Sequence, residues 1–497
     1  MKPIRFFLCL NHRALLLVAM SALAGGCALH APPREVSAAV PPQWFAPSPA
    51  ADASATLPHH GRVTDLTQWW VQQGDPLLVE LIASAQAVSP TVASARSRIE
   101  QARATRVAAG AALAPALDAS ASSSRSRSPP QAPGASALAT TAQAGLQASW
   151  EIDIFGGNLP GRNAAAQRLA GAEAQWHDAR VSVAAEVANQ YTSYTTCRAL
   201  QKITQADTAS RQETARLTDL SMKAGFTAPA TAALARASAA EASARATEQA
   251  ARCELDVKAL VALSALPEPD LKKKLALAPV IRAQAAPILI VTVPADALAQ
   301  RPDIFAAARE VAAASDDIGS AQAARYPRLA LSGSIGTSRA QGGGVSSDFN
   351  TWSIGPLSLT VPLFDGGRRA ADVDAATARY DDAAATYRGR VRQAVREVEE
   401  ALVNLQSTAA RSTDAQTAVD GYQAFFSGTE ALYKNGLASL VELEDARRTL
   451  LTAQTTLASL QQSRNSAWVS LYRAMGGGWT PAVNALNVVN AAGLPVR

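Results

Sequence analysis

The chain has 497 residues, of which 46 are Lys or Arg, 41 are Asp or Glu and 5% are aromatic. Three basic residues lie in a leader that export would remove, which leaves 43 basic against 41 acidic side chains and no cationic surplus for binding nucleic acid. After this leader there is no apolar run of roughly eighteen residues, so a mature chain that crosses a membrane must do so as strands.

Residues 1–26 are predicted to be an export signal, with a basic start, the apolar core Ala14–Leu23 and small residues before Cys27. A Cys in this position resembles the lipobox of bacterial lipoproteins, where it becomes the acylated first residue; ordinary signal cleavage with an incidental Cys is the alternative. Residues 27–61 are rich in Pro and Ala and are predicted to form an extended, lipid-anchored tether. The pair His59–His60 has no Cys or carboxylate cluster beside it, which indicates loop histidines and no metal site.

Four segments have the two-residue period of β-strands. Residues 142–154 alternate apolar and polar side chains without a break, as strands of membrane barrels do. Residues 352–363 alternate in the same way, with a change of parity at Gly355–Pro356 that predicts a bulge. Weaker partners lie near residues 115–125 and 327–337.

The segments between these strands, Ser126–Thr140 and Arg339–Phe349, are rich in Ser, Pro and Gly and are predicted to be surface loops. A half-buried sheet of a water-soluble protein would show the same alternation as a membrane barrel, so the pattern alone leaves both open. Four strands cannot close a barrel, and hydrocarbon does not tolerate an open sheet edge. The barrel interpretation therefore requires several copies of the chain.

Long helices follow the strands. Ala172–Ala224 contains neither Gly nor Pro over 53 residues, which corresponds to a helix of about 80 Å. After a turn at Gly225, Ala230–Leu266 is predicted to return as a second helix. A coiled-coil hairpin of this length is far larger than a globular core requires.

The same order of elements occurs twice along the chain. The matched landmarks are Pro90 and Pro302, Gly157 and Gly367, and Gly225 and Gly436, at offsets of 212, 210 and 211 residues. A constant spacing between landmarks of different kinds indicates a duplicated supersecondary unit. We therefore predict two tandem repeats, residues 62–285 with a hairpin turning at 225 and residues 286–480 with a hairpin turning at 436, followed by a tail at 481–497.

Two cysteines, Cys197 and Cys253, each lie 28 residues from the turn at Gly225. Two antiparallel helices leaving one turn would bring them to similar heights. Because disulfides persist in exported proteins, we expect a bridge between them. The alternative is two reduced thiols that face different helix seams.

Several motifs resemble those of a known family. They are Leu298–Ile304, Val361–Arg368, the turn Tyr433–Gly436 and Leu471–Trp479. In order and spacing they resemble the outer-membrane efflux proteins, the TolC-like channels, and specifically their NodT-type lipoprotein branch.

The resemblance implies a homotrimer. Each protomer would give four strands to a twelve-stranded outer-membrane β-barrel, which an α-helical barrel continues as a tunnel through the periplasm. A periplasmic adaptor, the membrane fusion protein, and an inner-membrane pump of the resistance-nodulation-division (RND) type would feed this channel. No cofactor, metal or nucleic acid is implied.

The resemblance also implies sites at the hairpin turns. The periplasmic gate falls on Tyr433, Val441, Asp445 and Arg448. The turns that meet the adaptor carry Lys223, Gly225, Lys434, Gly436 and Ser439. An ordinary solvated helix face is the alternative for the gate positions on one helix. The acidic residues Glu442 and Glu444 beside Asp445 suggest a further hypothesis, a preference of the mouth for cations.

The sequence favours a passive exit duct for small toxic molecules at the outer membrane, and no enzyme. Ser332–Gly336 lacks the first glycine of a hydrolase elbow, and no phosphate-binding Gly-Lys pair occurs. Two rivals remain: a duct for secreted polypeptides, which would use the same architecture, and a lipoprotein adaptor with one coiled-coil hairpin. The second would lack the strand at 142–154 and the second hairpin.

Overall fold

The computed structural model describes residues 31–46, 68–127, 138–277, 294–342 and 345–479. The predicted signal, Cys27, the pair His59–His60, the predicted repeat boundary and the tail at 481–497 lie outside these residues. The chain forms two compact units, one built around residues 98–172 and 306–387, the other around residues 38–97, 173–305 and 388–497. The first unit holds the sheet and the second the helical hairpins.

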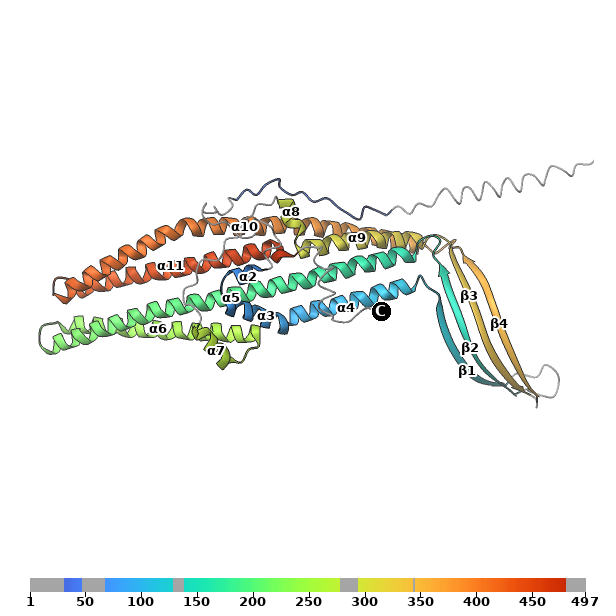
Figure 1. The fold of residues 1–497 in the computed structure, drawn as a ribbon, viewed down its shortest axis with the longest axis horizontal. Coiled ribbons are helices and arrows are strands. Elements are labelled where there is room, and N and C mark those ends of the chain that lie inside the picture. The colour runs from blue at the N-terminus through green and yellow to red at the C-terminus, as the bar shows by residue number, and fades with distance from the viewer. Residues whose placement is uncertain (1–30, 47–67, 128–137, 278–293, 343–344, 480–497) are drawn as a thin grey trace, which may run out of the picture. The chain divides into compact units, whose positions relative to one another are not determined.

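Two similar series of elements follow one another along the chain (Figure 1). The helices are α2 (Trp69–Gln72), α3 (Pro76–Val88), α4 (Pro90–Ala111), α5 (Asn158–Lys223), α6 (Pro229–Ser264), α7 (Glu268–Leu277), α8 (Pro294–Ala299), α9 (Pro302–Ala323), α10 (Arg368–Lys434) and α11 (Leu440–Ala474), and the strands are β1 (Ala116–Arg127), β2 (Leu138–Ile152), β3 (Arg328–Gly342) and β4 (Val345–Thr360). Helices α4 and α9 have 22 residues each, α5 and α10 have 66 and 67, and α6 and α11 have 36 and 35. This agreement confirms the tandem duplication.

Within the described residues, no single helix combines the length and apolar character needed to cross a membrane, although the bent pair α3 and α4 meets that criterion when taken together.

The four strands form one antiparallel sheet in the order β1-β2-β3-β4 (Figure 1). The second strand pair is longer than the sequence indicated. The predicted loop Arg339–Phe349 is wrong, because both its ends are strand and Arg339 pairs with Asp348 across the ladder. The segment forms strand despite its polar composition, because backbone pairing tolerates Ser and Gln as well as apolar residues.

The predicted bulge is confirmed. The register between β3 and β4 shifts between Leu331 and Gly333, opposite Gly355–Pro356. One extra residue on β4 reverses its parity, so Ile354 before the bulge and Leu357 after it reach the same face of the sheet.

Because paired residues share a face, the register sorts the side chains into two sets. One face carries an apolar band, whose rows are Ile152, Leu329 and Leu359; Trp150, Leu331 and Leu357; Leu117, Ala148 and Ile354; and Ala119, Leu146, Ile335 and Trp352. The opposite face carries Asp118, Gln147, Ser334 and Ser353 in one row and Ser120, Gly145, Gly336 and Thr351 in the next. Large apolar side chains of the first face are solvent-exposed, including Trp352 at 75%.

The hairpin helices form because long stretches lack helix-breaking residues. Pro229 stands in the first turn of α6, where its missing N–H costs nothing. Ser439 and Glu442 form a reciprocal capping box that opens α11. Helix α10 continues unbroken through its glycines, for example Gly421, whose missing side chain faces open space.

The core of the hairpin unit gathers residues from both repeats. Leu78 and Leu81 of α3, Tyr191 of α5, Leu402 of α10 and Leu471 of α11 are all buried. The ring of Trp69 stacks on Tyr472, with centroids 5.1 Å apart. The two repeats are therefore joined by a shared core, which holds the hairpins beside each other.

Arg301, in the motif before α9, ties three segments together. Its guanidinium donates to Asp303 at 3.0 and 2.8 Å and to the carbonyl oxygen of Ala474, at the end of α11, at 3.0 Å, and it forms an ion pair with Glu397 of α10 at 2.8 Å. Burial opposes ionisation of Asp303, but the hydrogen bond and the charge of Arg301 outweigh it and lower the pKa of this carboxyl. The motif is thus a structural joint of the hairpin unit.

Candidate functional site at the hairpin turns

The two hairpins end in turns of the same construction. Gly225 has φ +82° and Gly436 has φ +73°, in the left-handed region that favours glycine. The Phe226 N–H donates to the carbonyl of Ser221 at 2.9 Å, and the Leu437 N–H donates to the carbonyl of Leu432 at 2.8 Å. Each bond spans the last helical turn as in a Schellman motif, so both helices stop abruptly and the chain reverses.

Charged and apolar side chains are both exposed at these turns. Lys223 pairs with Asp219 at 2.7 Å and Lys434 with Glu430 at 3.0 Å, at positions 211 residues apart. Phe226 is 86% exposed, and its counterpart at position 437 is a Leu that is 74% exposed. Each turn therefore exposes one large apolar side chain beside a salt bridge.

The turns differ in their capping. The residue before α6 is Ala228, which has no side-chain cap, whereas Ser439 caps α11 by accepting from the Glu442 N–H at 3.2 Å. The Glu442 carboxylate accepts in return from the Ser439 N–H at 2.6 Å. The second turn is therefore the better-fixed of the two.

Tyr433 faces the first hairpin. It packs beside a small apolar cluster that includes Ala215 and Leu443, and its hydroxyl lies 3.1 Å from that of Thr218 on α5. Because the Thr218 hydroxyl donates to the carbonyl of Thr214 at 2.7 Å, Tyr433 donates to Thr218. The side chain thus links α10 to α5 within one protomer.

A buried polar cluster joins the hairpins further from the turns; we call Asp207, Arg211, Ser238, Glu444 and Arg447 the inter-hairpin cluster. Arg211 of α5 donates to Asp207 at 2.9 and 3.0 Å, to Ser238 of α6 at 2.5 Å, and to Glu444 of α11. Ser238 donates to Glu444 at 2.7 Å, and Arg447 donates to Glu444 at 2.8 Å. One carboxylate of the second hairpin is thereby held by three donors from two hairpins.

Arg447 is the most deeply placed member, with its side chain 3% exposed. It also donates to Thr214 at 2.6 Å and to the Ser210 hydroxyl at 3.0 Å, and its guanidinium lies 5.7 Å from the centroid of the Phe426 ring. Burial, and then repulsion from Arg211, lower the pKa of Arg447. Buried charges of this kind are stable only while their partners stay in place, so the cluster resists separation of α11 from α5.

The structure does not bring the four residues of the predicted gate together. Val441, Asp445 and Arg448 lie on one exposed face of α11, and Asp445 and Arg448 pair with each other. Tyr433 lies apart, against α5. Three of the four residues are therefore exposed, whereas Tyr433 contacts the first hairpin.

The inter-hairpin cluster itself was not predicted from the sequence. The available signals were the spacings of Arg211 and Asp207 at i, i−4 and of Arg447 and Glu444 at i, i−3, which are also common on solvated helices. The cation-preference hypothesis loses part of its basis, because Glu444 is neutralised by two arginines and Glu442 serves as a cap.

Cys197 of α5 and Cys253 of α6 are joined as a disulfide in the structure, with Cα atoms 5.5 Å apart. Both side chains are buried. The bridge lies at equal sequence distance from Gly225 on both helices and ties the first hairpin together; no cysteine pair occupies the second.

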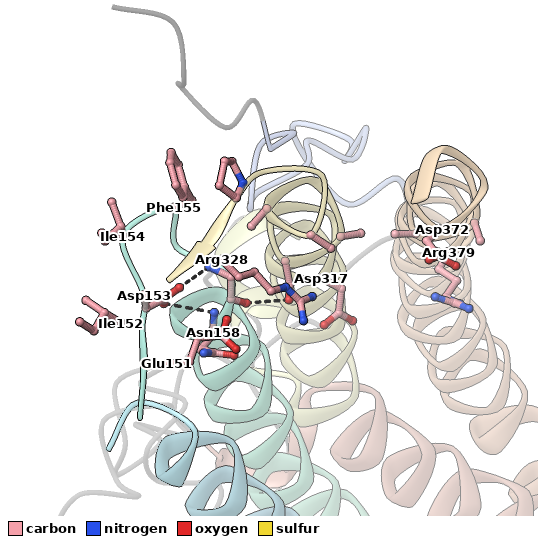
Figure 2. Close-up of a pocket in the computed structure, with 18 residues that line it drawn as sticks. Glu151, Ile152, Asp153, Ile154, Phe155, Asn158, Asp317, Arg328, Asp372 and Arg379 are labelled. Carbon is pink, nitrogen blue, oxygen red and sulfur yellow. Dashed lines mark hydrogen bonds between the residues drawn. The ribbon is translucent and has the colours of Figure 1, made fainter. Parts of the chain in front are cut away.

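A cavity of about 560 Å³ lies in the sheet unit, where β2 and β3 meet α5, α9 and α10 (Figure 2). Its walls carry both signs of charge, with Asp317 and Asp372 opposing Arg328 and Arg379. Asp153 accepts from three backbone N–H groups at the start of α5, at 2.5, 3.1 and 2.8 Å. This carboxylate caps α5 at the positive end of the helix dipole, so Asp153 stabilises the connection between β2 and α5. Within the described residues no group of three or more metal-ligating side chains is found.

Comparison with known proteins identifies the architecture. The family model described as "Outer membrane efflux protein" matches residues 81–266 and 293–477. The solvent efflux pump outer membrane protein SrpC of Pseudomonas putida is 31% identical over 416 residues, covering 82% of this chain and 87% of that protein. Nodulation protein T of Rhizobium leguminosarum bv. trifolii is 28% identical over 452 residues, covering 90% and 94%. The solved structure of the outer-membrane channel OprN matches with a TM-score of 0.78 at 26% identity, covering 91% of this chain and 100% of that one.

One family match falls within each half of the chain, and the fold is the TolC-like one of four strands and long hairpins. The resemblance read from the motifs, including its NodT-type branch, is confirmed. This chain belongs to the outer membrane efflux protein family and is the outer-membrane channel of an efflux pump, not an enzyme.

Proposed function

We propose that this chain forms a homotrimeric, lipid-anchored exit duct that releases small toxic molecules, delivered by a periplasmic adaptor and an inner-membrane RND-type pump. The observation that carries the proposal is the sheet, which has an exposed apolar face, a polar opposite face and two open edges. Strands β1 and β4 have 12 and 16 residues, and each leaves a row of backbone groups unpaired within one chain. Three copies would pair these edges and supply twelve strands.

The tether supports the anchoring at Cys27. Arg34 forms an ion pair with the buried carboxylate of Asp316 on α9, and Tyr380 of α10 donates to the carbonyl of Pro33 at 2.9 Å. Cys27 precedes Arg34 by seven positions, so an acylated Cys27 would lie within about 24 Å of this contact. Held in this way, the lipid would enter the leaflet beside the sheet.

The substrate class is proposed from relatives and from the duct itself. Relatives at about 30% identity are named as solvent, toluene and pyoverdine export proteins, which differ widely in chemistry. The polar face of the sheet consists largely of Ser, Thr, Gln and Gly, which offer no dedicated pocket. A wide polar duct selects weakly, so we assign selection to the pump. Polypeptide export is the second candidate, and no described feature favours it.

We propose that the hairpin turns form the periplasmic mouth. Opening requires α11 to move away from α5, and the inter-hairpin cluster opposes this movement. The exposed face with Val441, Asp445 and Arg448 would meet its counterparts in neighbouring copies and narrow the mouth. The turns around Gly225 and Gly436 would contact the adaptor, with the second turn, fixed by its capping box, as the firmer contact.

The proposal is tested by deleting the gene and measuring sensitivity to toluene and to antibiotics. Expression of the wild-type chain should restore resistance. A chain with Cys27→Ser should reach the outer membrane in smaller amounts. Full resistance in the deletion strain, with its pump still expressed, would contradict the function as an exit duct.

A further inference from the structure

The duplication relates each residue of the first hairpin to one of the second. The outgoing helices end at Lys223 and Lys434 and the return helices begin at Pro229 and Leu440, in both cases 211 residues apart. Within one chain the hairpins meet where α5 contacts α11, at the inter-hairpin cluster. At the same offset α5 corresponds to α10, and α11 corresponds to α6. Because a ring of repeated units closes by reusing one kind of contact, α10 of one copy is expected to meet α6 of the next.

Helix α10 exposes aromatic side chains at positions that are covered on α5. Tyr422 and Phe425, which lie on one face of α10, are 43% and 55% exposed. Their counterparts Arg211 and Thr214 are each 7% exposed, and both bond to residues of α11. The face that α11 covers on α5 is therefore exposed on α10. Its aromatic rings would gain by removal from water.

The charges of the inter-hairpin cluster change together between the two positions. Both carboxylates and one arginine are replaced by uncharged residues, and the corresponding pairs are Asp207 and Ala418, Glu444 and Ala233, and Arg211 and Tyr422. Losing only one sign of charge would leave the other without a partner, which is costly in a buried contact. The joint loss indicates that these positions of α6 and α10 belong to one surface in the assembled protein.

One arginine of the cluster keeps its charge at the second position. Arg447, which is 3% exposed, corresponds to Arg236 on α6, which is exposed. Across the contact within the chain, Arg447 donates to the hydroxyl of Thr214 at 2.6 Å. The counterpart of Thr214 is Phe425. A guanidinium placed over the face of an aromatic ring is attracted by the charge distribution of the ring, so Arg236 and Phe425 are chemically matched.

We propose that α6 of a second copy of this chain covers the exposed face of α10, with Arg236 of one copy over the ring of Phe425 of the next. Tyr422 packs against the short side chain of Ala233, and Gly421, at which a Cβ would meet open space, leaves room for the guanidinium. The proposal rests on the proposed function, because it names the surface through which copies of the duct bind. A charged contact within each copy then alternates around the ring with an aromatic contact between copies.

The position of the contact is tested by cross-linking. The full chain carrying Arg236→Cys/Phe425→Cys is expressed in outer-membrane vesicles and treated with a short bifunctional maleimide. Linked species of two and three chains should appear on a denaturing gel, whereas each single variant should remain at one chain. The matched control is Leu234→Cys/Gln423→Cys, which changes two exposed residues on nearly opposite sides of the same helices. This control should give no links.

The chemistry of the contact is tested by the rate at which the detergent-solubilised assembly loses chains on warming, followed by native mass spectrometry. Phe425→Leu, which keeps an apolar side chain, and Arg236→Gln should each speed dissociation about two- to fivefold. The double variant should dissociate no faster than the faster single variant, because both changes remove the same interaction. Phe425→Tyr keeps an aromatic ring and should dissociate at the rate of the wild type.

The outcomes separate the contact from the assembly. The proposal is overturned if the wild type has the mass of three chains but Arg236→Cys/Phe425→Cys gives no links, or if the control pair links equally well. It is also overturned if the effects of Phe425→Leu and Arg236→Gln simply add. A wild-type preparation that contains only single chains would refute the homotrimer itself, and the contact with it.

Discussion

Glu444→Gln should open the periplasmic mouth. Glu444 accepts from Arg211, Ser238 and Arg447, and the substitution removes the charge while keeping one acceptor oxygen. Hydrogen bonds to charged groups contribute about 1.5–3 kcal/mol each, so the loss of charge across these contacts should cost about 3 kcal/mol. If these contacts break when α11 leaves α5, the equilibrium between open and closed mouths shifts about 100-fold. Open probability in planar bilayers should rise accordingly.

The exposed pair provides the matched control. Asp445 and Arg448 are 54% and 75% exposed, and a pair of this kind contributes no more than about 1 kcal/mol. Asp445→Asn should therefore raise the open probability by about fivefold at most. If Asp445→Asn opens the channel while Glu444→Gln leaves it as closed as the wild type, contacts between copies govern the mouth and the role given to the inter-hairpin cluster is refuted.

Three further outcomes are expected. Protein alkylated without reduction should carry no adducts at Cys197 and Cys253, and two adducts would show free thiols. Reduction should lower the stability of the first hairpin by about 4 kcal/mol, as expected when a disulfide that closes a loop of 56 residues is opened. Asp303→Asn should lower the melting temperature near neutral pH. Because the pKa of Asp303 is depressed in the folded chain, the difference from wild type should persist above about pH 4 and vanish as the pH falls through the folded pKa. A difference that grows as the pH falls would contradict this assignment. Gly477→Ala should destabilise the hairpin unit by about 1–3 kcal/mol, because its Cβ would lie 2.5 Å from Val181; unchanged thermal stability would show that this contact relaxes freely.

Much of the fold was predictable because its elements are long and regular. The alternation around Leu146 is typical of a strand, and a long stretch with few Gly or Pro residues, as in α5, is typical of a helix. Because the unit is duplicated, each of these patterns occurs twice. Even the bulge at Gly355–Pro356 was predictable, since the parity of the alternation changes at a single point. The strand ends at residues 339–342 and 345–349 were missed because Ser and Gly at the end of a strand are equally typical of loops.

The site was less predictable. Positions on one helix face, such as Val441 and Asp445, follow from spacing, but partners across helices do not. Arg211 and Glu444 are 233 residues apart, and their contact depends on how two hairpins pack. The rotation of Tyr433 toward α5 depends on the same packing. Sequence spacing fixes neighbours along an element, whereas contacts between elements require the tertiary arrangement.

In the proposed assembly, one chain supplies only part of a pore wall, and copies of it close the sheet. The most direct test measures the mass of the detergent-extracted full chain together with its conductance in planar bilayers. We expect a particle of three chains that produces stepwise ion currents. A stable particle containing a single chain that gives no current would contradict it.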